Sequence, residues 1–127
     1  VSDFIMQALE TETIQIRSGH KVWRRYCDAR DFMHVLVAAA QKYKDTRFDS
    51  GGTLVEVGEL ADLISESLER ELTLERPAIA TQTDDFYYPD ATEYARLAKS
   101  LAVAQSELTP LVKTTLGMHI HQRNVNA

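Results

Sequence analysis

TLVEVGELADLISESLEREL, residues 53–72, combines a helix start signal with an amphipathic period, and it sets the fold class that the sequence predicts. Thr53 and Glu56 have the spacing of a capping box, in which each side chain accepts a backbone N–H at the start of a helix. Beyond them, aliphatic residues recur every three or four positions, as on the buried side of an α-helix: Val57, Leu60, Ala61, Ile64, Leu68 and Leu72. The pattern predicts a helix from about 54 to 72.

Similar patterns precede this segment. Ser2 can cap a first helix, because its side-chain oxygen can accept a free N–H of the first turn. The run 20–44 places apolar residues on one stripe at about 100° per residue, with Met33 and Val37 in its middle. Since its second half is apolar almost all round, we expect 20–44 to be the central and most enclosed helix.

The remaining segments are set apart by proline and by loss of the helical period. Residues 11–17 alternate as a strand would, and the sequence leaves helix and strand open there. Residues 73–89 have no helical period, which predicts one long loop with a short strand as the alternative. Pro89 opens another helix, Pro110 breaks or kinks it, and a flexible tail is expected from about 118.

These elements together predict an all-α fold, a bundle of four to five helices with one long loop at about 73–89. The chain has 127 residues, which fits one domain with a single core. We therefore predict one helical domain over residues 1–127.

Composition and charge restrict the class of protein. Hydrophobic residues make up 44% and charged residues 26% of the chain, as in ordinary globular proteins. The longest nearly apolar run, 32–40, is well short of the roughly 20 residues of a membrane span, so no membrane partner is expected. Cys27 is the one cysteine, and the start lacks the pattern of a secretory signal, which favours an intracellular protein or a virion component.

The net charge of −5 and a pI near 5.3 disfavour nucleic acid as the main partner, because proteins that grip phosphate backbones are basic.

Three acidic residues follow one another at steps of three in the opening stretch: Glu56, Glu59 and Asp62. This E-x-x-E-x-x-D spacing resembles the first carboxylate helix of the all-α nucleoside triphosphate pyrophosphohydrolases. The resemblance implies that these side chains hold Mg²⁺ against a triphosphate, because hard cations prefer carboxylate oxygens. The family pattern also needs a second helix with an E-x-x-D pair, where this chain has Leu97 and Lys99. A metal-dependent pyrophosphohydrolase is the alternative function.

A helical wheel assigns the same acidic row to solvent. At about 100° per residue, the later acids fall opposite the apolar stripe: Glu59, Asp62, Glu66 and Glu69. Metal ligands in a bundle must face the other helices, and Glu56 already serves the capping box. We therefore expect a solvated acidic face, with no metal and no cofactor.

DDFYYPD, residues 84–90, combines acids with three consecutive aromatic residues: Phe86, Tyr87 and Tyr88. Aromatic clusters are typical anchors of protein interfaces. Three neighbours cannot all point into one core, so at least one should form an exposed apolar patch. The alternative is that Phe86 and one tyrosine close the end of the bundle.

The basic residues of HKVWRR, residues 20–25, supply the opposite charge: Lys21, Arg24 and Arg25. Because 56–90 is acidic, the acidic aromatic loop of one copy could meet the basic region of the next. The leading prediction is thus a non-enzymatic interaction or assembly subunit that binds a protein partner or itself. We expect the three aromatics of the loop and these three basic residues to form its interface.

Overall fold

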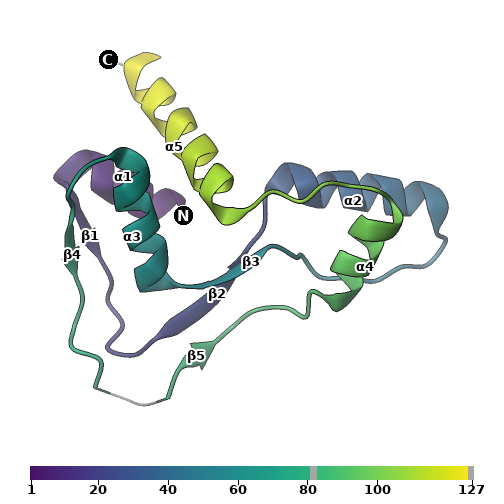
Figure 1. Ribbon diagram of the computed structural model, residues 1–127, viewed down its shortest axis with the longest axis horizontal. Coiled ribbons are helices and arrows are strands. Elements are labelled where there is room, and N and C mark those ends of the chain that lie inside the picture. The colour runs from purple at the N-terminus through teal and green to yellow at the C-terminus, as the bar shows by residue number, and fades with distance from the viewer. Residues whose placement is uncertain (81–82, 126–127) are drawn as a thin grey trace.

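A computed structural model describes residues 1–80 and 83–125. It contains helices and two small sheets (Figure 1), so the predicted all-α bundle is wrong. In chain order the elements of the described residues are α1 (Ser2–Thr11), β1 (Thr13–Gln15), β2 (Val22–Tyr26), α2 (Ala29–Lys42), β3 (Thr53–Glu56), α3 (Val57–Leu68), β4 (Thr73–Glu75), β5 (Asp85–Phe86), α4 (Thr92–Ser100) and α5 (Leu108–Val125).

Strand β2 is the middle of a sheet with the order β3-β2-β5, antiparallel to β3 and parallel to β5. A second, parallel pair joins β1 to β4. As a result, residues 73–80 and 83–87 run beside 12–23 in the same direction (Figure 1). Backbone N–H groups of Thr73, Ala80, Asp85 and Tyr87 donate in turn to the carbonyls of Glu12, Gly19, Lys21 and Trp23.

The predicted central helix 20–44 is in fact a strand followed by a shorter helix. Val22, Trp23 and Tyr26 are β-branched or aromatic residues that favour strands, and residues 23–26 pair with residues 53–56 of β3. Asp28 then caps α2, since its Oδ1 accepts the N–H of Arg30 at 2.7 Å. The apolar period of 20–44 therefore belongs to a helix only from Ala29 onward.

The predicted capping box is also wrong. Thr53–Glu56 is strand β3, and Glu56 itself is the N-cap of α3, with its Oε2 accepting the N–H of Gly58 at 2.7 Å. The helix ends at Leu68, before the predicted residue 72, because Glu69 takes a left-handed conformation with φ of 52°. A strand partner upstream thus shifted the helix start by three residues.

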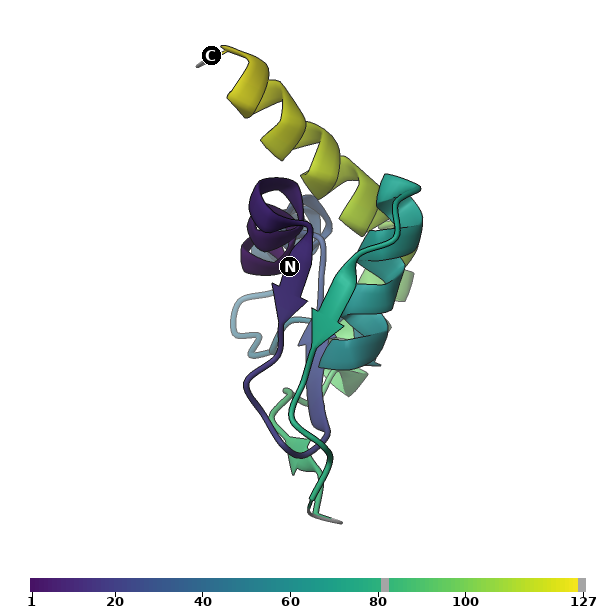
Figure 2. The same ribbon diagram turned by 90° about the vertical axis from the view of Figure 1, so that its left-hand side faces the viewer.

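The larger hydrophobic core lies between α1, α3 and α5 and the strands beside them (Figure 2). The apolar stripe of α3 is buried there as predicted, and its acidic residues face solvent as predicted. The fully buried side chains of this core are Ile5, Ala8, Ile14, Leu60, Ile64 and Val112.

A smaller core joins α2 to α4. Val35 and Leu97 are fully buried and Tyr94 stacks on Phe32, with 6.2 Å between the ring centroids. Because α4 covers one side of α2, Met33 and Val37 remain about half exposed, at 49% and 50%. The prediction that these two residues occupy the middle of an enclosed helix is wrong.

The structure also differs from the predictions for residues 73–89 and for the segment from about 118. The segment 73–89, predicted as one loop, contains β4 and β5. Helix α5 passes through Gly117 and continues to Val125, so the predicted tail from about 118 is helical as far as 125. Pro110 lies in the first turn of α5, where the missing N–H of proline breaks no helical hydrogen bond. None of the helices in the described part of the chain has the length and apolar character needed to cross a bilayer.

Candidate functional site

Six side chains of β2 and the β5 region cluster on the two sides of one pair of strands, and we call them together the aromatic–arginine surface: Trp23, Arg24, Arg25, Phe86, Tyr87 and Tyr88. Its aromatic members from the β5 region are the most exposed aromatics of the described chain. Phe86 is 58%, Tyr87 78% and Tyr88 41% exposed. Parallel pairing of β5 with β2 brings these rings to the basic residues that lie 63 positions earlier.

One side of the paired strands carries a ladder of rings. Trp23 stacks on Phe86, with 6.2 Å between centroids and 14° between planes. Phe86 meets Tyr88 edge to face at 6.1 Å, and the guanidinium of Arg25 lies over the Tyr88 ring at 5.5 Å. Such stacked and cation–π pairs favour these geometries. The four residues alternate along their strands, as side chains on one side of a sheet must.

The other side of the strands carries the remaining arginine. The guanidinium of Arg24 lies 5.5 Å from the centre of the Tyr87 ring, and its Nη2 is 2.7 Å from Asp85 Oδ2. The hydrogen bond from Arg24 lowers the pKa of Asp85 below its ordinary value. Arg24 therefore holds both a carboxylate and an aromatic ring of the β5 region in place.

The acidic residues of DDFYYPD make contacts within their own chain. Trp23 Nε1 donates to Asp84 Oδ2 at 2.8 Å, and Asp90 Oδ1 accepts the N–H of Thr92 at 2.9 Å at the start of α4. Both contacts fix the loop on either side of the aromatic residues. The loop is thus anchored at its ends, while its rings stay in solvent.

The structure brings together five of the six residues predicted as an interface. Phe86, Tyr87 and Tyr88 meet Arg24 and Arg25 within one chain, whereas the sequence analysis placed the basic residues on a neighbouring copy. Lys21, the sixth, is exposed and lies one residue before β2. Sequence reasoning missed Trp23, although the β-branched and aromatic residues Val22, Trp23 and Tyr26 were a signal for a strand.

A second cluster lies on the inner side of β2, around Glu56. Its Oε1 accepts the N–H of Val22 at 3.0 Å, and Arg76 donates through Nη2 to Oε1 at 2.8 Å and through Nη1 to Oε2 at 3.0 Å. Arg76 Nη2 also donates to the carbonyl of His20 at 2.7 Å. One carboxylate thus joins β2, the start of α3 and the segment after β4.

The protonation of Glu56 reflects these contacts. Burial opposes its ionisation, but the hydrogen bonds from Arg76, Val22 and Gly58 outweigh this effect and lower the pKa of Glu56 from 4.5 to about 2. Glu56 is therefore an ionised structural anchor. Its oxygens are already engaged by four N–H groups.

The predicted carboxylate row does not converge on one point. Glu59 and Asp62 lie on the exposed side of α3, while Glu56 is buried against Arg76. Within residues 1–80 and 83–125, no three His, Cys, Asp or Glu residues are grouped closely enough to hold a metal ion. The resemblance to all-α pyrophosphohydrolases also lacks its fold, because this chain is mixed α/β.

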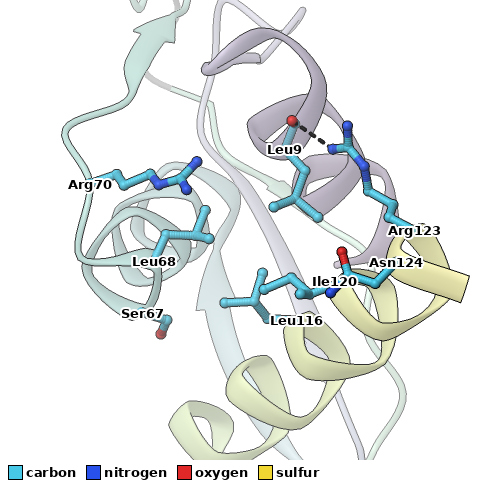
Figure 3. A pocket seen from close by; sticks show the side chains of 8 residues that line it. All are labelled: Leu9, Ser67, Leu68, Arg70, Leu116, Ile120, Arg123 and Asn124. Atoms are coloured by element: carbon cyan, nitrogen blue, oxygen red, sulfur yellow. Dashed lines mark hydrogen bonds between the residues drawn. The ribbon is translucent and has the colours of Figure 1, made fainter. Parts of the chain in front are cut away.

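A pocket of about 480 Å³ opens where α1, α3 and α5 end, away from both clusters. Figure 3 shows aliphatic side chains between the three helices, with Arg70 and Arg123 on opposite sides. Arg123 Nη1 donates to the carbonyl of Leu9 at 2.7 Å, which satisfies a free carbonyl at the end of α1. We interpret this arginine as a helix cap, and the aliphatic lining as the margin of the larger core: Leu9, Leu68, Leu116 and Ile120.

Comparison with known proteins adds no relative: neither the models of protein families nor the curated proteins contain a match to this chain.

Proposed function

We propose that this chain is a non-enzymatic interaction subunit that binds another protein through the aromatic–arginine surface. One observation carries the proposal: three consecutive aromatic side chains are exposed to solvent by 41–78% while the loop that bears them is held by specific contacts. Exposed clusters of large apolar side chains mark interaction sites.

The residue types of the surface support a protein partner. Aromatic residues and arginine dominate the hot spots of protein interfaces, because they bury large areas and also form polar contacts. Here Arg24 and Arg25 hold the rings of Tyr87 and Tyr88 before any partner arrives. A preorganised surface loses less conformational entropy on binding, so a modest contact area gives useful affinity.

The charge arrangement favours a different protein over a second copy. Arg24 and Arg25 would attract the acidic loop of a neighbouring copy, but each already contacts the loop of its own chain. The driving force for head-to-tail pairing of identical copies is thereby reduced. An intracellular or virion complex is the setting we propose, in line with the single cysteine of the chain.

The test compares two double variants of the full chain. Tyr87→Ser with Tyr88→Ser removes two exposed rings of the surface, and Met33→Ser with Val37→Ser removes two apolar side chains of similar exposure on α2. We expect the tyrosine variant to lose its complex with the partner protein in size-exclusion chromatography with light scattering. The α2 variant should retain that complex. Both should keep the helical circular dichroism of the wild type.

Photo-crosslinking identifies the partner directly. A photoreactive phenylalanine analogue at position 87 should give covalent adducts with a second protein, while the same group at position 37 should give few. Equal adducts from both positions would contradict the proposal. Unfolding of the tyrosine variant would show that the rings support the fold.

A further inference from the structure

Residues 73–80 and 83–87 contain the outer strands of the two sheets, β4 and β5. Strand β5 is the last strand of the order β3-β2-β5, and β4 is paired to β1 on one side, among the residues that the structure describes. Figure 1 shows β5 along the outside of the molecule, and Figure 2 shows α3 beside β4. Strand β5 therefore has an edge open to another strand.

Backbone groups of β5 point outward at one defined position. The N–H groups of Asp85 and Tyr87 donate inward, to the carbonyls of Lys21 and Trp23. In a parallel ladder, alternate residues direct their N–H and C=O groups to opposite sides. The N–H and C=O of Phe86 are therefore directed away from β2, toward the free edge.

The same edge is rich in exposed apolar side chains. Of the eleven large hydrophobic residues exposed in the described chain, five lie on this short part of the sequence. Open sheet edges pair with other chains unless charges, prolines or a covering element protect them. Here acids and Pro89 flank the edge, and the position of Phe86 between them stays open. An open edge with apolar side chains is thus suited to strand addition. The five residues are Leu74, Ile79, Phe86, Tyr87 and Tyr88.

The charge of the segment selects the occupant. Five acids lie between 71 and 90: Glu71, Glu75, Asp84, Asp85 and Asp90. Arg76, the one cation between 71 and 90, is occupied by Glu56. Asp84, Asp85 and Asp90 already make contacts within the chain. None of them is fully buried and the segment keeps an excess of acids, so an added strand that carries lysine or arginine would meet net negative charge along this edge.

Strand β2 shows which chemistry the β5 region accepts. Between β2 and β5, Trp23 stacks on Phe86 on one side of the strands, and Arg24 pairs with Asp85 on the other side. A basic and aromatic strand therefore satisfies both the rings and the acids of this segment. A second copy cannot offer its β2, because β3 and β5 already occupy both edges of that strand.

We propose that the free edge of β5 binds an extended segment of a different protein, in which Lys or Arg residues alternate with apolar ones. The added strand bonds to the N–H and C=O of Phe86, and its apolar side chains pack beside the exposed rings. This inference rests on the proposed function and names the class of partner. Pro89 limits the pairing at one end, since proline has no N–H to donate.

The probe is a peptide with blocked ends that copies residues 20–26, HKVWRRY, added to the full wild-type chain. Amide hydrogen exchange followed by NMR is the measurement. We expect the Phe86 amide to exchange about tenfold more slowly at saturation, because exchange then requires opening of the added strand. The amides of Asp85 and Tyr87 are already bonded to β2 and should change much less.

Two matched peptides distinguish the contribution of charge from the contribution of backbone hydrogen bonds. Replacing the three basic residues of the peptide by glutamate should abolish the protection, since this edge is acidic. Methylation of the alternate backbone nitrogens that would face β5 should also abolish it, while leaving every side chain in place. Equal binding by the glutamate peptide would overturn the charge argument and the proposal with it.

Other outcomes overturn the proposal in distinguishable ways. If Phe86 exchange is unchanged with HKVWRRY while the tyrosine variant still loses its partner, the proposed function stands and partner docking uses side chains only. Faster exchange in Val22–Tyr26 would mean that the peptide displaces β2. A single-stranded oligonucleotide that perturbs Trp23 and Tyr87, with no response to the peptide, would indicate a base-stacking platform.

Discussion

Two carboxylate–arginine pairs flank β2 and have nearly the same length but opposite surroundings. Glu56 and Arg76 are 2.8 Å apart with side chains 6% and 14% exposed, whereas Asp85 and Arg24 are 2.7 Å apart with 43% and 30% exposed. The buried pair joins three segments of the fold, and the exposed pair positions a ring in solvent. The distance between the charges therefore says little about their role. Burial and the number of additional hydrogen bonds distinguish an ion pair that stabilises the fold from one that positions an exposed side chain.

Removing the buried arginine should have the largest effect. Arg76→Ala leaves the Glu56 carboxylate buried without its counter-charge, which typically costs about 3–5 kcal/mol. Urea unfolding at pH 7 measures the loss. For the matched variant Arg24→Ala, we expect a midpoint close to that of the wild type, because solvent screens the exposed pair. Similar losses in both variants would show that burial does not distinguish the pairs.

Acidic pH should have the next largest effect, and it should weaken the buried Glu56–Arg76 pair more than the Asp85–Arg24 pair. The pKa of Glu56 is lowered from 4.5 to about 2, so its contribution to stability is complete above about pH 4.5 and is lost as the pH falls toward 2. A shift of this size corresponds to about 3 kcal/mol. Urea midpoints between pH 6 and pH 2.5 measure the slope.

In Glu56→Gln, this part of the pH dependence should disappear, and the variant should already be less stable at pH 7. In Asp85→Asn the acid slope should stay close to that of the wild type, since Asp85 is exposed. If Glu56→Gln retains the full slope, other carboxylates carry the acid sensitivity.

The smallest expected changes in stability come from substitutions of two glycines, one of which lies beside the buried pair. A Cβ at Gly58 would lie 2.7 Å from Glu56 Oε2 and 2.8 Å from Arg76 Nη1, so Gly58→Ala should push the pair apart and cost about 1–3 kcal/mol. Gly117 in α5 has no atom within 4 Å of its added Cβ, and Gly117→Ala should stabilise the helix by about 0.5–1 kcal/mol. Thermal unfolding compares the two, and a gain in both would contradict the tight fit at Gly58.

Some of these structural features could be predicted from the sequence. The exposed acidic side of α3 and its buried stripe follow from a period of 3.6 residues, and the structure confirms both. The consecutive aromatics at 86–88 predicted at least one exposed ring, and the structure leaves all three exposed. In contrast, Glu56 was assigned to a capping box with Thr53, since its true partners, Val22 and Arg76, lie 34 and 20 positions away.

The sequence by itself determined where apolar stripes and exposed acids lie on α3, because an α-helix bonds each residue to a neighbour four positions away. Only the tertiary structure decided that 22–26 is a strand, because its hydrogen bonds come from residues 53–56 and 85–86. The same long-range pairing placed Arg24 and Arg25 on the rings of Tyr87 and Tyr88. A strand gains its backbone partners from distant parts of the chain, so local periodicity cannot reveal which residues it will bring together.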